Sequence, residues 1–190
     1  MQSISPRWHA WLVAAVAFGT CLSAQAQKVK LATTQGDIVI ELDAAKAPKT
    51  VDNFVQYVKA GHYDGTVFHR VIENFMIQGG GMLPNLSEKP THKPIPLESH
   101  NGLTNTRGTL AMARTGDPNS ATAQFFINVV DNAFLDAANA RDGNGYAVFG
   151  RVVEGMDVVD RIRAVPAGNK GGNENVPLQP VTITKATLEK

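Results

Sequence analysis

The chain has 190 residues, with 18 Lys or Arg, 17 Asp or Glu and a formal net charge of +1 at neutral pH. A chain this close to neutral lacks the excess of basic residues with which nucleic-acid-binding proteins neutralise phosphates, so that class is excluded. Internal repeats, low-complexity tracts and domain linkers are all missing from the sequence, which favours one folded domain.

The first 26 residues have the composition of a secretory signal peptide. Arg7 is the only charged residue before Lys28, and an apolar run occupies residues 10–19. This run is shorter than the roughly 20 residues needed to span a bilayer, so a signal peptide is favoured over a membrane anchor or a disordered tail. The small residues at the end of the segment predict cleavage after Ala26 and, in a Gram-negative bacterium, export to the periplasm.

The mature domain predicted by this cleavage is residues 27–190. It keeps no cysteine and no tryptophan, because Cys21, Trp8 and Trp11 all precede it, and it has 17 basic and 17 acidic residues. Disulfides, thiol nucleophiles and cysteine metal sites are therefore excluded, and an ordinary apolar core must stabilise the domain. We expect a monomer with no membrane span after cleavage and no nucleic-acid partner.

The first elements follow from hydrophobic periodicity. Residues 28–43 predict a β-hairpin, since apolar and polar residues alternate on both sides of a turn at 35–37. Residues 47–61 predict an α-helix with Pro48 in its first turn and Gly61 at its C-terminal stop. The apolar side chains of this helix share one face, which we expect in the core: Val51, Phe54, Val55 and Val58.

Short apolar runs rich in Val, Ile, Phe and Thr dominate the rest of the chain. They lie at residues 66–72, 75–80, 109–114, 124–130, 146–153 and 181–188. Many short strands with turn signals between them predict an antiparallel barrel or sandwich. Residues 154–165 predict a second helix, in which Met156, Val159 and Ile162 share a face, and the proline-rich residues 83–102 predict a long surface loop.

The polar residues form no familiar catalytic set. The four histidines after residue 27 have no metal-ligand spacing, and no serine lies in a G-x-S-x-G motif. The glycines at 79–81 and 168–172 do not fit a phosphate-binding loop. We therefore expect no metal and no cofactor. His69 is expected to be a structural histidine with its polar atoms satisfied, and the aspartates at 131, 136 and 142 to bond local backbone.

Five segments, in order, resemble the signature sequences of the cyclophilins, a family of peptidyl-prolyl cis-trans isomerases. They are FHRVIENFMIQGGG, GTLAMART, SATAQFFINV, FLD and YAVFGRVVEGMDVVD. The resemblance runs from about residue 29 to residue 188, and the exported bacterial branch is the most similar. It implies a mainly β fold, a closed eight-stranded antiparallel β-barrel capped by two α-helices, with the active site in a groove on the outer face.

The same resemblance assigns roles to particular residues. It implies that Arg70 is the catalytic hydrogen-bond donor and that Gln78 holds the substrate backbone and positions Arg70. The proline pocket would be formed by Phe75, Met76, Phe126 and Leu135, with Ala113 and Gln124 lining the neighbouring groove. Tyr146 stands where many relatives carry histidine, and Phe134 also lies in the substrate-binding groove.

Two positions depart from better-known relatives. Phe134 stands where many carry a tryptophan whose indole N–H helps to bind cyclosporin, so we expect weak cyclosporin binding. Arg114 stands where many have asparagine, and it is either a second positive charge near the groove or a solvated side chain.

The residues by themselves leave rival functions open: a module that only binds proline-containing segments, and a barrel that carries a small ligand. The arginine of the first motif favours an isomerase. Its expected partners are proline-containing peptides and unfolded exported proteins.

Overall fold

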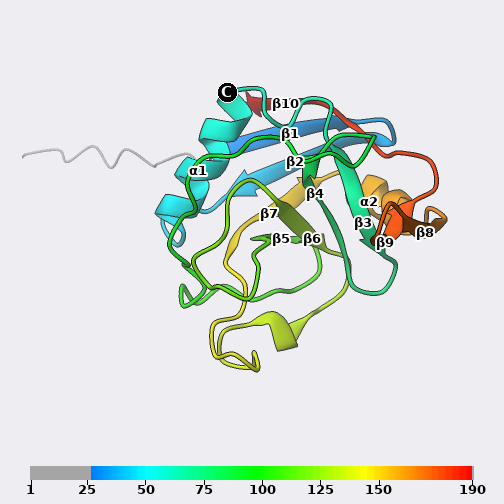
Figure 1. Cartoon of the computed structure of the whole chain (residues 1–190). Coiled ribbons are helices and arrows are strands. Elements are labelled where there is room, and N and C mark those ends of the chain that lie inside the picture. Colours follow the sequence, from blue (N-terminus) through cyan, green and yellow to red (C-terminus); the bar gives the residue numbers. More distant parts are fainter. Residues whose placement is uncertain (1–26, 190) are drawn as a thin grey trace, which may run out of the picture.

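The computed structural model describes residues 27–189, in which an eight-stranded antiparallel sheet forms the framework (Figure 1). The predicted signal peptide, residues 1–26, lies outside the described residues. The strands are β1 (Lys28–Thr33), β2 (Gly36–Leu42), β3 (Val67–Ile72), β4 (Met76–Met82), β5 (Thr109–Met112), β6 (Phe125–Asn128), β7 (Val148–Glu154) and β10 (Ile183–Glu189). Their spatial order is β10-β1-β2-β7-β5-β6-β4-β3, so β10 and β3 form the two edges.

The sheet curls into a half-barrel that stays open, and the predicted closed barrel is therefore wrong in this respect. No strand ladder joins β3 to β10 in the described chain; the edges meet through an isolated bridge between Val67 and Thr182. Register shifts interrupt β3 on both sides of Phe68. Such bulges bend a strand and increase its twist, so only the first residues of β3 reach the other edge.

Two α-helices lie at opposite ends of the curled sheet, α1 (Pro48–Lys59) and α2 (Met156–Arg163) (Figure 1). Both predicted helices are confirmed, although each is shorter than its periodic segment. The α2 helix begins after Gly155, whose φ of +84° and close approach to the Asp37 carbonyl leave no room for a Cβ atom.

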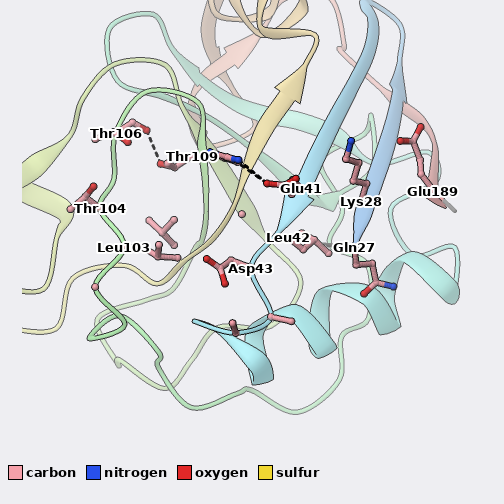
Figure 2. A pocket seen from close by; sticks show the side chains of 16 residues that line it. Gln27, Lys28, Glu41, Leu42, Asp43, Leu103, Thr104, Thr106, Thr109 and Glu189 are labelled. Carbon is pink, nitrogen blue, oxygen red and sulfur yellow. Dashed lines mark hydrogen bonds and ion pairs between the residues drawn. The ribbon is translucent and has the colours of Figure 1, made fainter. Parts of the chain in front are cut away.

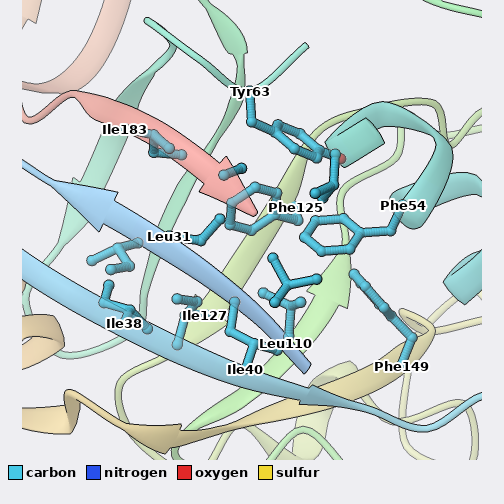
Figure 3. Close-up of a cluster of buried hydrophobic side chains, with 14 of the residues drawn as sticks. Leu31, Ile38, Ile40, Phe54, Tyr63, Leu110, Phe125, Ile127, Phe149 and Ile183 are labelled. Atoms are coloured by element: carbon cyan, nitrogen blue, oxygen red, sulfur yellow. The ribbon is translucent and has the colours of Figure 1, made fainter. Parts of the chain in front are cut away.

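The main core fills the inside of the curl, where aromatic rings meet side chains from most strands (Figure 3). Phe54 of α1 packs edge-on against Phe125 of β6, with ring centroids 5.6 Å apart, and also contacts Phe149 of β7. The apolar face predicted for α1 is confirmed, because all four of its side chains are buried. Helix and sheet are thus joined by one close-packed aromatic cluster.

A hairpin and a short helix were not predicted. Residues 167–177 form a hairpin of β8 (Ala167–Lys170) and β9 (Asn173–Pro177), which turns at two glycines with positive φ and packs against β3. A short 3-10 helix, η1 (Ala133–Leu135), follows β6. The proline-rich segment 83–102 is irregular apart from isolated bridges, as expected. Among residues 27–189, no helix is both long enough and apolar enough to cross a membrane.

Candidate active site

One row of directly opposed residues crosses the outer face of the sheet. Arg70 on β3 faces Gln78 on β4, Gln78 faces Phe126 on β6, and Phe126 faces Ala111 on β5. Directly opposed residues project from the same face of a sheet, so these four side chains lie together. The adjacent row points into the core and is buried: Val71, Ile77, Ile127 and Leu110.

An apolar cluster separate from the main core lies on this outer face. Its buried members are Met76, Ala111, Phe126, Leu135 and Val148, and Ile72, Phe75, Leu103, Ala113 and Tyr146 pack against them. Every residue predicted for the proline pocket is in this set. A cluster of this kind binds an apolar ring favourably, since the ring leaves water on contact.

The polar residues of the row, Arg70 and Gln78, lie beside this cluster. Gln78 Nε2 donates to Gln124 Oε1 at 2.9 Å, which fixes the orientation of both amides. Arg70 is half-buried, and within residues 27–189 no carboxylate forms an ion pair with it. A hollow of about 260 Å³ is lined by Arg70, both glutamines, His69, Met82, and Asn173 and Glu174 of the unpredicted hairpin. The guanidinium therefore faces an accessible hollow next to an apolar wall.

His69, next to the arginine, differs from the expectation of a satisfied structural histidine. His69 is 5% exposed, and its Nδ1 has no hydrogen-bond partner in the described chain. Burial lowers the pKa of the His69 imidazole to about 4, and the Arg70 charge acts in the same direction. The ring is therefore neutral at physiological pH, so Arg70 supplies the positive charge of this hollow.

A larger hollow, of about 1110 Å³, lies at the ends of β1 and β2 and contains none of the predicted site residues (Figure 2). Glu41 of β2 and Arg151 of β7, directly opposed in its wall, form an ion pair at 2.9 Å. No group of three His, Cys, Asp or Glu side chains suited to a metal occurs among residues 27–189. We place the candidate site at the Arg70 row, where free donors adjoin an apolar cluster.

Comparison with known proteins decides the family. The model of the cyclophilin type peptidyl-prolyl cis-trans isomerase/CLD family matches residues 28–188. The chain belongs to this family. It is 59% identical over 161 residues to the peptidyl-prolyl cis-trans isomerase cyp18 of Streptomyces antibioticus, covering 84% of this chain and 97% of that protein. It is 55% identical over 180 residues to an isomerase of Acinetobacter baylyi, covering 93% and 95%.

Solved structures agree with this assignment. A Cryptosporidium parvum cyclophilin type isomerase, determined in the presence of the dipeptide Ala-Pro, is 27% identical to this chain with a TM-score of 0.74. The match covers 86% of this chain and 99% of that one. This cyclophilin is thus a peptidyl-prolyl cis-trans isomerase, a rotamase.

The rim of the cyclophilin's apolar cluster is aromatic. Phe134 of η1 is 59% exposed and stacks on Phe75, with ring centroids 5.6 Å apart. Phe126 meets the Tyr146 ring edge-on at 5.6 Å. The four aromatic residues predicted for the groove thus form two separate pairs.

A buried asparagine network, which was not predicted, bonds the backbone of the pocket residue Phe75. Asn132 Nδ2 donates to Asn128 Oδ1 at 2.7 Å, and Asn128 Nδ2 donates to Asn105 Oδ1 at 3.2 Å. Asn105 in turn donates from its backbone and side chain to Asp136 Oδ1. Asparagine is depleted in strands, so Asn128 at the end of the apolar run of β6 was the one available signal.

Arg114 lies near the groove, with its Cζ atom 4.6 Å from the centre of the Tyr146 ring. Its side chain is 4% exposed and pairs with Asp142, so it is not a solvated side chain, and its positive charge near the groove is paired with a carboxylate. The aspartates behave only partly as expected. Asp142 accepts from the nearby Asn144 and Gly145 backbone, whereas Asp131 and Asp136 bond residues 105–107, far away in sequence.

Proposed function

We propose that this cyclophilin accelerates rotation about X-Pro bonds with Arg70 as the donor and the outer apolar cluster as the proline pocket. The observation that supports this most strongly is the single row joining Arg70, Gln78 and Phe126 across three strands. It places one permanent positive charge beside one apolar pocket. Stabilising a twisted prolyl amide would need both, the charge for the amide nitrogen and the pocket for the proline ring.

The chemistry requires no nucleophile. Delocalisation of the nitrogen lone pair gives the peptide bond a rotation barrier of about 18–20 kcal/mol. In the twisted state the lone pair is localised on nitrogen, and a donor aimed at that atom binds this state better than either planar form. Arginine is always charged, donates only and holds its donors in a rigid plane, so Arg70 suits this role.

The hydrogen bond from Arg70 is too weak to account for the acceleration by itself. A 10⁵-fold acceleration corresponds to about 7 kcal/mol, and one charge-assisted hydrogen bond contributes roughly 1.5–3 kcal/mol. The pocket of Phe75, Met76, Phe126 and Leu135 would hold the proline ring while the preceding carbonyl turns. Gln78, fixed by Gln124, would hold the substrate backbone.

We further propose that the clients are exported proteins folding in the periplasm. The support is the sequence of residues 1–26, with its charged start, short apolar run and small residues before the predicted cleavage point. Uncatalysed prolyl isomerisation takes about 10–100 s and can limit folding. A rotamase beyond the inner membrane would remove that delay.

The decisive experiment follows exchange between cis and trans forms of a short Ala-Pro peptide by NMR. Residues 27–190 should accelerate exchange, and Arg70→Ala should lose most of the acceleration while remaining folded by circular dichroism. Arg151→Ala, which removes an arginine paired with Glu41 at the other hollow, is the matched control and should retain activity. If the Arg70 variant bound the peptide and catalysed as well as wild type, the proposed donor would be wrong.

A further inference from the structure

We propose that Arg114 is a positioning residue that holds the Tyr146 ring as a wall of the proline pocket and so sets the affinity for proline-containing peptides. This inference rests on the proposed function, because it takes the outer apolar cluster as the peptide site. It assigns Arg114 a role in binding and none in stabilising the twisted amide.

The guanidinium of Arg114 is held on several sides. Its Nε donates to the Gly145 carbonyl at 2.9 Å, one terminal nitrogen donates to the Thr115 carbonyl at 2.9 Å, and the other pairs with Asp142. The Arg114 side chain is 4% exposed and its bond to Gly145 is partly buried, while its bonds to Thr115 and Asp142 lie at the surface. A side chain held in this way has one orientation and can act as a rigid support.

That support lies directly behind Tyr146. The Arg114 Cζ atom is 4.6 Å from the centre of the Tyr146 ring, a cation–π geometry. The same ring meets Phe126, a buried member of the apolar cluster, in a T-shaped arrangement. The Tyr146 ring therefore lies between the Arg114 guanidinium and the pocket.

The backbone of Gly145 and Tyr146 is fixed as well. Tyr146 N–H donates to the Leu135 carbonyl at 2.9 Å, and Leu135 is another buried member of the cluster. Gly145 has a φ of +60° and lies so close to the Leu135 carbonyl that no Cβ atom would fit. The bond from Arg114 to Gly145 thus acts on a segment that already contacts two walls of the pocket.

The difference in charge pairing between Arg114 and Arg70 distinguishes the binding role of Arg114 from a catalytic role. Asp142 neutralises Arg114, whereas no carboxylate of residues 27–189 pairs with Arg70. A neutralised cation behind a tyrosine ring contributes little to the field at the rotating bond. Its loss should therefore weaken peptide binding without changing the rate at which bound peptide isomerises.

The test compares Arg114→Met with Arg151→Met, a matched control at the ion pair with Glu41. NMR titration with an Ala-Pro peptide gives Kd, and exchange at saturating peptide gives the rate of the bound form. Arg114→Met should raise Kd about tenfold, equivalent to 1.4 kcal/mol, with the bound rate within about twofold of wild type. Asp142→Asn, at an exposed loop position, should give a smaller rise, and Arg151→Met none.

Coupling to the tyrosine provides the second measurement. If Arg114 acts through Tyr146, adding Arg114→Met to Tyr146→Leu should raise Kd no further. Additive effects of the two changes on Kd would overturn the proposal. So would an unchanged Kd in both Arg114→Met and Asp142→Asn. A third contradicting result would be a lower isomerisation rate of the bound peptide with no change in Kd. Absence of turnover by the wild-type protein would instead contradict the proposed function, so the two failures are distinguishable.

Discussion

Asn132 connects the segment that leads into η1 to the start of β4: its side-chain Nδ2 donates to the Phe75 backbone carbonyl at 2.8 Å. Asn132 is 2% exposed, and its Nδ2 also donates to Asn128 Oδ1 at 2.7 Å. Through this residue the buried network reaches the backbone of a pocket wall. Phe75, in the turn before β4, and Leu135, in η1, are thereby held in a fixed relation.

Substitution of Asn132 should affect both stability and binding. Asn132→Leu leaves Asn128 Oδ1 without this donor in the interior, and an unsatisfied buried group costs about 1–3 kcal/mol. We expect a loss of unfolding free energy of that size in urea titrations, with weaker peptide binding. Asn139→Ala is the matched control, since Asn139 also donates to a carbonyl but is exposed; its effect should stay within about 0.5 kcal/mol.

His69 should make the stability of the protein depend on pH. Its pKa is lowered from about 6.5 to about 4 by burial, so the unfolded chain binds a proton before the folded one does. The unfolding free energy should therefore fall as pH falls from 6.5 towards 4, by at most about 3 kcal/mol from this residue. Urea unfolding at several pH values measures this slope.

The matched variant for that slope is His69→Gln, which keeps a polar side chain but does not titrate. The unfolding free energy of this variant should depend less steeply on pH than that of the wild type. Some slope should remain, because burial also lowers the pKa of His62. An identical slope in wild type and variant would mean that the pKa of His69 is the same in the folded and unfolded states, contrary to this prediction.

Cyclosporin should inhibit this cyclophilin weakly. Phe134 has no indole N–H, the donor that the resemblance to cyclophilins with tryptophan at this position implies for binding of the drug. Phe134→Trp should restore one neutral hydrogen bond, worth about 0.5–1.5 kcal/mol, and tighten inhibition by up to roughly tenfold. The side chain is exposed, so the larger ring fits at the rim without disturbing the core. Nanomolar inhibition of the wild-type protein would contradict this prediction.

The rate of catalysed isomerisation should be flat between pH 6 and pH 8. The proposed donor, Arg70, keeps its charge throughout this range, and His69 beside it stays neutral because its pKa is about 4. Exchange measurements on the bound peptide, with protein stability checked at each pH, test this. A bell-shaped profile would reveal a titrating side chain in the rate-limiting step.

Local chemistry, read from the sequence, determined most of the elements. Alternation predicted the hairpin of β1 and β2, and the 3.6-residue period predicted the buried face of α1. The motif around Arg70, with the ordered segments that follow, indicated the family. Each of these signals lies within a short stretch of chain, where residue type and spacing determine the outcome.

Tertiary structure alone decided three other features: the open edge between β3 and β10, the asparagine network and the buried position of Arg114. The open edge depends on bulges in β3, which alternation does not reveal. Asn105 and Asp136 are 31 residues apart in the chain, and Arg114 and Asp142 are 28 apart. A polar side chain carries no sequence signal of a distant partner, because that partner is chosen by the path of the backbone between them.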